Sequence, residues 1–150
     1  YPETEWPLQL ISSKSPLQNS YSIGARRLRG IHPDNPVAVH PDDAAHLGLQ
    51  SGDKVYLETP GGRAAATMIL RHGVQRGVVA VEHGFGHREL GARAHTIGGQ
   101  TRPHEPAIGA GTNLNDMGLS DPSRSGRNVF VDPVAGTAVR QGLPARIVRA

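Results

Sequence analysis

Glycine and proline are the residues that most constrain this chain, because 19 glycines and 12 prolines are spread through its 150 residues. Both residue types interrupt long helices and favour tight turns. The length suits a single hydrophobic core. We therefore expect one domain over residues 1–150, mainly β, with short strands and only short helices.

Apolar residues alternate with polar ones in several short segments, as strands require. One helix is predicted at 41–47: Pro41 suits its first turn, Asp42 and Asp43 suit the positive end of the helix dipole, and Gly48 suits its end. The predicted strands are 8–12, 37–40, 54–59, 63–70, 78–81, 128–131 and 145–148, and single helical turns are predicted at 23–28 and 114–117.

One segment, 82–127, shows almost no periodicity and contains nine glycines. Connections in compact domains are usually about 4–6 residues long, and much longer ones usually serve a function. Apart from the helical turn at 114–117, we expect this segment to be an irregular, functional loop.

The composition excludes several kinds of site and partner. With no cysteine, the chain cannot form disulfides, thiolate zinc sites or iron–sulfur ligation. The longest apolar run, 64–70, is far below the roughly 20 residues that span a bilayer, so we expect no direct membrane insertion. The net charge is only +3 and the arginines are dispersed, so no nucleic-acid partner is expected.

His83 and His87 are spaced four residues apart, as two metal ligands on one helix would be. Gly84 and Gly86 disfavour that helix, and no cysteine or suitably spaced carboxylate completes a metal site, so none is predicted. The chain also lacks a nucleophile elbow, a phosphate-binding P-loop and a dinucleotide-binding glycine fingerprint. We therefore predict no catalytic residues within it.

The order of motifs resembles a known family. A strand ending in Val39-His40 is followed by Pro41-Asp42-Asp43-Ala44-Ala45, then by Leu47-Gly48 and by Gly52-Asp53-Lys54-Val55. This order resembles the C-terminal domain of the dimethyl-sulfoxide-reductase superfamily of molybdenum oxidoreductases. The resemblance implies a double-psi β-barrel that binds a molybdopterin guanine dinucleotide, carrying molybdenum or tungsten, and covers roughly residues 8 to 132.

The resemblance also suggests which residues contact the cofactor. In the family, the loop after the first strand supplies hydroxyls, amides and a cation, and a late glycine-rich loop supplies an asparagine; the loop after 78–81 is a third candidate, through His87 or Arg88. The matching positions are Ser12, Ser13, Lys14, Gln18, Asn19, Ser20, His87, Arg88, Asn113 and Asn115. Their hydroxyl, amide and cationic groups can bind the edge of a pterin and the phosphates.

Within the superfamily, residues 82–95 look most like tetrathionate reductase and its polysulfide and arsenic-oxyanion relatives. The resemblance implies upstream domains of the same polypeptide that share the cofactor, and a partner subunit that transfers electrons through iron–sulfur clusters. The first residue, Tyr1, is not methionine, so we expect the natural polypeptide to extend upstream.

Two other double-psi barrels are alternatives. A recognition module such as the N-terminal domain of AAA ATPases would explain the strands but not the glycine-rich segment 82–127. A pyruvoyl decarboxylase of the aspartate-decarboxylase kind requires a Gly-Ser bond for self-cleavage, and no glycine here precedes a serine. The sequence therefore removes the decarboxylase and leaves the recognition module open.

Overall fold

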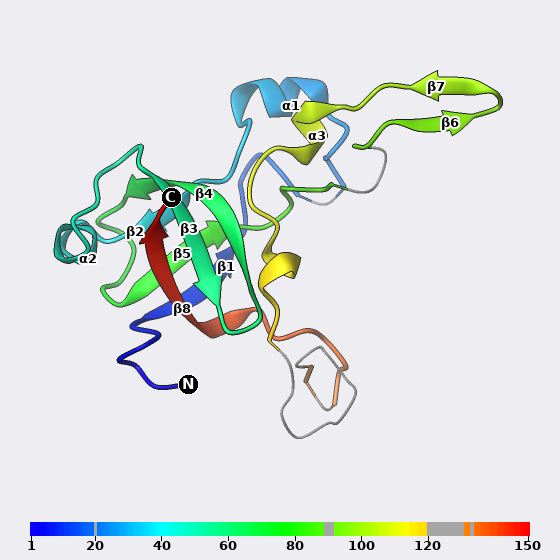
Figure 1. Cartoon of the computed structure of the whole chain (residues 1–150). Coiled ribbons are helices and arrows are strands. Elements are labelled where there is room, and N and C mark those ends of the chain that lie inside the picture. Colours follow the sequence, from blue (N-terminus) through cyan, green and yellow to red (C-terminus); the bar gives the residue numbers. More distant parts are fainter. Residues whose placement is uncertain (20, 89–91, 120–130, 133) are drawn as a thin grey trace.

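The computed structural model describes residues 1–19, 21–88, 92–119, 131–132 and 134–150. Six strands form a closed barrel in the order β1-β5-β2-β4-β3-β8 (Figure 1). The barrel strands are β1 (Leu8–Ser13), β2 (Val37–Val39), β3 (Lys54–Thr59), β4 (Gly62–Leu70), β5 (Val78–Glu82) and β8 (Gln141–Arg149).

The strand pairing mixes directions. β1 runs parallel to β5 and β2 runs parallel to β4, while the pairs β2–β5, β3–β4, β3–β8 and β1–β8 are antiparallel. Each parallel pair joins strands separated by other elements in the sequence, so each needs a crossover connection. The predicted mainly β fold with a double-psi barrel is confirmed.

Alternating side chains of the strands fill the barrel. In β3, Val55 and Leu57 have no exposed surface, and their neighbours along the strand are more exposed. β5 shows the same period, with Val79 and Val81 buried and the residues between them partly exposed. The core therefore follows the two-residue period of the sequence.

A short helix, α2 (Pro41–His46), links β2 to β3 at the edge of the barrel. His40 caps it, because its Nδ1 accepts a hydrogen bond from the backbone N–H of Asp42 at 3.2 Å. Asp43 accepts a hydrogen bond from the N–H of Gly77 at 2.7 Å, which holds the helix beside the start of β5. The helix predicted at 41–47 is confirmed to within one residue.

The prediction that 82–127 is irregular except at 114–117 was wrong. The helical turn is present as the 3-10 helix η1 (Leu114–Met117), but the segment also contains the hairpin β6 (His95–Ile97) and β7 (Gln100–Arg102) and the helix α3 (Pro106–Gly109). The hairpin strands are mostly exposed, so they have no buried face to impose alternation on the sequence.

Two element boundaries also differ from the prediction. The helical turn predicted at 23–28 is the helix α1 (Arg26–Ile31), three residues further along. β8 begins four residues before the predicted strand 145–148, because Gly142, at φ +68°, and Pro144 obscure the strand pattern. Residues 128–130 lie outside the described residues, and Val131 forms an isolated bridge with Ala138.

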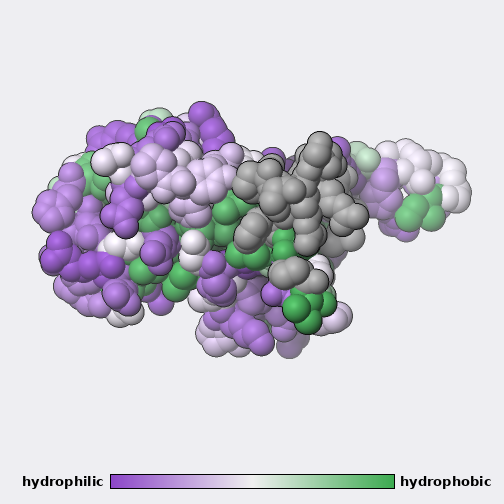
Figure 2. Space-filling model, turned by 90° about the horizontal axis from the view of Figure 1, so that it is seen from below, coloured by the Kyte–Doolittle hydropathy of each residue, from purple (hydrophilic) through white to green (hydrophobic). Residues whose placement is uncertain are grey.

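The helices α1 and α3 and the β6–β7 hairpin lie together on one side of the barrel (Figure 1). α1 and α3 are side by side, and the β6–β7 hairpin extends beyond them as an arm (Figure 1). Figure 2 shows the arm projecting from a molecule whose visible barrel surface is mostly hydrophilic. No helix in the described part of the chain is long and apolar enough to cross a membrane.

Candidate functional site

Two loops leave the barrel at the same end. Because β1 and β5 are parallel and Ser13 is in register with Glu82, the chain segments that follow them start side by side. The N–H of His83 donates a hydrogen bond to the carbonyl of Ser13 at 3.0 Å, which joins the loops at their origin. Since β2 is antiparallel to β5, the segment that enters β2 arrives at this end as well.

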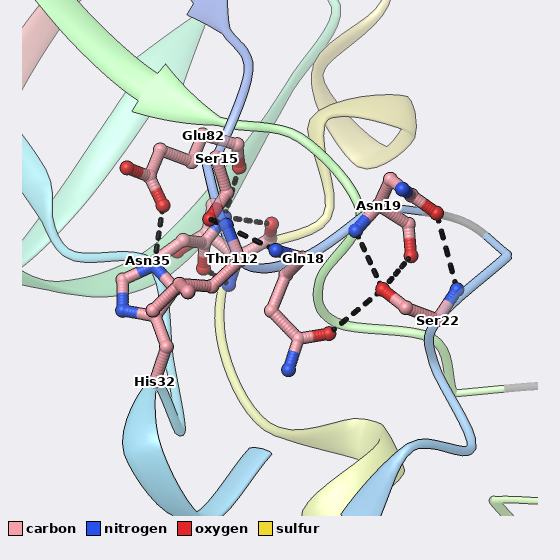
Figure 3. A network of polar contacts seen from close by, with 9 residues as sticks. Ser15, Gln18, Asn19, Ser22, His32, Asn35, Glu82 and Thr112 are labelled. Atoms are coloured by element: carbon pink, nitrogen blue, oxygen red, sulfur yellow. Dashed lines mark hydrogen bonds and ion pairs between the residues drawn. The ribbon is translucent and has the colours of Figure 1, made fainter. Parts of the chain in front are cut away.

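Asn35, in that entering segment, ties the loops together (Figure 3). Its side chain is only 2% exposed. Its Nδ2 donates to the carbonyl of Glu82 at 2.6 Å and to the carbonyl of Thr112 at 2.9 Å, and its Oδ1 accepts from the N–H of Thr112 at 2.6 Å. One buried amide therefore fixes the loop after β5 against the late glycine-rich loop.

Two glycines allow these loops to approach so closely. The N–H of Gly86 donates to the carbonyl of Ala110 at 2.8 Å. A Cβ on Gly86 would lie 2.6 Å from the backbone nitrogen of Asn113, and a Cβ on Gly111 would lie 2.4 Å from Oδ1 of Asn35. Both glycines have positive φ, +66° and +89°, so any other residue would also be strained.

The loop after β1 is held by its own polar side chains. The hydroxyl of Ser15 accepts from the N–H groups of Leu17 and Gln18, and Oδ1 of Asn19 accepts from those of Tyr21 and Ser22. Oε1 of Gln18 accepts a hydrogen bond from the hydroxyl of Ser22 at 3.3 Å (Figure 3). Gln18 is 1% exposed, and its Nε2 has no hydrogen-bond partner among the described residues.

A histidine and a glutamate line the outer wall beside these loops. Nε2 of His32 lies 2.5 Å from a carboxylate oxygen of Glu82, and the ring of His32 meets the buried ring of Phe85 edge-on at 5.3 Å. His32 and Glu82 also line a cavity of about 530 Å³ on the outer surface of β2 and β5, together with Ser13. The contact between His32 and Glu82 therefore links the end of α1 to β5.

The predicted site residues that the structure describes lie at the end of β1, in the loop that follows it, in the loop after β5, and in the late glycine-rich loop with η1. On the first loop, Lys14 is exposed and has no hydrogen bond or ion pair within the described part of the chain. The hydroxyl of Ser12 accepts a hydrogen bond from Nε2 of Gln141 at 3.1 Å, so it faces β8. Ser20 lies outside the described residues.

The other predicted residues lie on the second and third loops. Nε2 of His87 is buried without a hydrogen-bond partner among the described residues. Arg88 is exposed and lies 3.7 Å from the carboxylate of Asp116. Oδ1 of Asn113 accepts from the N–H of Asn115 at 3.0 Å and so caps η1, which leaves the amide nitrogen of Asn113 as its available group. Asn115 is exposed.

Sequence reasoning missed the residues that assemble the loops, above all Asn35 and Thr112. Asn35 stands between Asp34 and Pro36, where an asparagine reads as part of a turn. Its hydrogen bonds reach 47 and 77 residues along the chain, so no local pattern announces them. Thr112 lies within the glycine-rich motif, but its role depends on the same distant partner.

Residues 8–127 match the family model described as the molydopterin dinucleotide binding domain. The chain belongs to this family. The match includes the whole of the segment 82–127, which the hypothesis of a recognition module left unexplained. The predicted family resemblance is thereby confirmed.

Sequence identity to individual proteins supports this family assignment. The chain is 49% identical to a tetrathionate reductase subunit from Salmonella typhimurium over 149 residues, which cover 99% of this chain and 15% of that protein. It is 30% identical over 91 residues to the thiosulfate reductase molybdopterin-containing subunit of the same organism, covering 58% of this chain and 12% of the relative. The chain thus spans less than a sixth of the length of either relative.

A solved structure supports the fold of this family member. Acetylene hydratase from Pelobacter acetylenicus superposes with a TM-score of 0.66, covering 99% of this chain and 19% of that chain. The sequence identity is 23%, so this similarity concerns the fold alone.

Proposed function

We propose that this chain is the cofactor-holding domain of a molybdenum reductase of the tetrathionate-reductase type, and that it binds a molybdopterin guanine dinucleotide at the end of the barrel where the three loops meet. The observation that carries the proposal is the 49% identity to the Salmonella typhimurium tetrathionate reductase subunit, sustained over 99% of this chain. The reductase activity belongs to the longer polypeptide, whose upstream domains share the cofactor and whose electron-transfer partner carries iron–sulfur clusters.

The residues present fit such a group. Buried polar groups in proteins are almost always hydrogen-bonded, so an unpaired one at a loop end points to a missing partner. Nε2 of Gln18 and Nε2 of His87 are two of the three buried side-chain polar atoms without a partner among the described residues. Both belong to loops at the proposed end of the barrel, and an amide nitrogen and an imidazole nitrogen suit the heteroatoms of a pterin or guanine.

The charges at this end suit the phosphates. Lys14 is exposed on the first loop, and Arg88 is exposed on the second with its guanidinium 3.7 Å from Asp116. Each side chain can reach an anion in solution without first losing a short hydrogen bond. An ammonium group offers a point charge and a guanidinium a planar fork, and both bind phosphate oxygens.

The contributions of the proposed residues differ. The cofactor would be bound directly by Gln18, His87 and the amide nitrogen of Asn113. Ser13 and Asn115 would lie at the edges of the site. Asn19 instead stabilises its own loop, and Ser12 is hydrogen-bonded to Gln141. When bound, the cofactor would supply a redox-active metal. This chain positions it and offsets its charge; it contains no cysteine, so a thiolate metal ligand would come from another part of the polypeptide.

A segment exchange tests the proposal. The matching segment of the Salmonella typhimurium tetrathionate reductase subunit is replaced by this chain, and the purified chimera is analysed for molybdenum, for guanine nucleotide released by acid, and for tetrathionate reduction. We expect both molybdenum and guanine nucleotide, each at a level comparable to the parent protein. A folded chimera without either would contradict the proposal.

A further inference from the structure

A cavity of about 590 Å³ lies between α1 and α3, which pack side by side outside the barrel (Figure 1). Its lining contains none of the residues proposed above to contact the cofactor. The cavity is therefore separate from the proposed cofactor site. The lining residues are Ile23, Gly24, Arg26, Arg29, Gly30, Glu105, Ala107 and Ile108.

Arg29 is the unusual member of this lining, because it is only 5% exposed. Its Nε donates to the carbonyl of Ile23 at 2.8 Å, its Nη1 donates to the carbonyl of Ala107 at 2.6 Å, and its guanidinium lies 5.7 Å from the centre of the Phe85 ring. Nη2 is buried and has no hydrogen-bond partner among the described residues. Burial lowers the pKa of the guanidinium, which nevertheless stays charged at neutral pH.

No carboxylate of the described residues forms an ion pair with Arg29: both of its acceptors are neutral backbone carbonyls, and it has no hydrogen bond or ion pair with Glu105, which also lines the cavity. Buried charges in proteins are normally paired, because removing an ion from water is costly unless an opposite charge and hydrogen bonds compensate it. The buried guanidinium therefore lacks an anion.

We propose that the cavity between α1 and α3 binds a small oxyanion, held by Arg29. The lining carries two arginines against one glutamate, so its charge favours an anion. Ile23, Ala107 and Ile108 provide an apolar wall, which strengthens the attraction by excluding water. An oxyanion can accept hydrogen bonds from the free N–H groups of the planar guanidinium, as carboxylates and phosphates do.

Two glycines offer a way to close the cavity without touching Arg29. A Cβ on Gly24 or on Gly30 would meet no atom within 4 Å, and neither residue has the positive φ that other residues avoid. Leucine at either position therefore fits the backbone and places an apolar side chain at the cavity. Gly73, which has an equally open Cβ position and lies outside this cavity, supplies the matched control.

The test is a titration of this chain, labelled with nitrogen-15, in which the NMR signal of the Arg29 Nε–H group is followed. Sodium thiosulfate is the first probe, sodium acetate distinguishes sulfur oxyanions from carboxylates, and sodium chloride at equal ionic strength is the reference. We expect a saturable shift with at least one oxyanion, with a dissociation constant of about 1 mM or below, and no saturable shift with chloride.

Substitutions test whether the oxyanion that shifts the Arg29 signal binds in this cavity. Gly24→Leu and Gly30→Leu should weaken oxyanion binding at least about tenfold, whereas Gly73→Leu should leave it unchanged. Arg29→Lys, which lacks the reporting Nε–H group, is followed by isothermal titration calorimetry and should weaken binding similarly, and thermal denaturation checks that the variant folds. An Arg29 signal that does not respond to either oxyanion, that responds equally to chloride, or that responds unchanged in both cavity variants would overturn the proposal.

Discussion

Asn35 holds the loops of the proposed site in place, and replacing it with aspartate removes its two donors at almost constant shape. The new carboxylate would still accept the hydrogen bond from the N–H of Thr112, now 2.6 Å from Oδ1 of Asn35. It would instead present an oxygen to the carbonyls of Glu82 and Thr112, which lie 2.6 and 2.9 Å from the present Nδ2. Both carbonyls lose their donor.

Leaving a buried acceptor unsatisfied costs about 1–3 kcal/mol. Two such losses give an expected destabilisation for Asn35→Asp of about 2–6 kcal/mol, since the 2% exposure of Asn35 leaves little access to water. For a domain of this size, that corresponds to a fall in Tm of roughly 4–24 °C. Urea denaturation gives the free energy, and hydrogen exchange at the Thr112 amide shows whether the loop loosens locally.

Asn115→Asp is the matched control, because it makes the same chemical change on an exposed side chain of the neighbouring loop. Surface substitutions of this kind usually change stability by less than about 0.5 kcal/mol. If Asn35→Asp and Asn115→Asp were equally stable, the reasoning that Asn35 holds the loops together would be refuted.

Three further predictions concern single positions. Gly111→Ala should destabilise the fold by more than Gly99→Ala, whose φ is also positive but whose Cβ would meet no atom, and about 1 kcal/mol or more should separate them in urea denaturation; equal losses would mean that the loops can move apart. Thr59→Val should cost about 1–3 kcal/mol by the same assay, because it removes the buried hydroxyl that donates at 2.8 Å to a carbonyl of η1; an unchanged stability would contradict this role. In the chimeric protein, Lys14→Ala should lower molybdenum content and Lys54→Ala should not, since Lys54 lies on β3 and donates to a threonine hydroxyl of β4; similar metal content in both variants would remove Lys14 from the site.

The barrel was predictable because its strands have one buried face. Strands such as Lys54–Thr59 alternate visibly in the sequence, and α2 carries its own proline and acidic start signals. The β6–β7 hairpin was not predictable in this way: Ile97 is 67% exposed, and nothing in the hairpin must face a core. The one feature of the sequence that could have indicated the hairpin is its turn, Gly98 and Gly99, because paired glycines suit a two-residue hairpin turn. In the structure these glycines have φ of +57° and +77°.

The candidate site was predictable as three loops but not as a network. Glycine-rich and hydroxyl-rich segments indicated where a ligand could be approached, and the parallel pairing of β1 and β5 explains why two of those loops start together. The sequence could not reveal that Asn35 joins the end of β5 to the late glycine-rich loop, because its hydrogen bonds are made to residues 47 and 77 positions away. Nor could it show that Arg29 is buried, since arginine on a short helix is usually exposed.

The proposed cofactor site at one end of the barrel depends most on the unpaired side-chain nitrogens of Gln18 and His87. The most direct test is the molybdenum content, measured by mass spectrometry, of the chimeric protein carrying Gln18→Leu together with His87→Phe. The control pairs Gln100→Leu with His95→Phe on the exposed hairpin. We predict that the first variant, purified folded, loses most of its molybdenum while the control retains it. Full molybdenum loading of the first variant would contradict the proposed site.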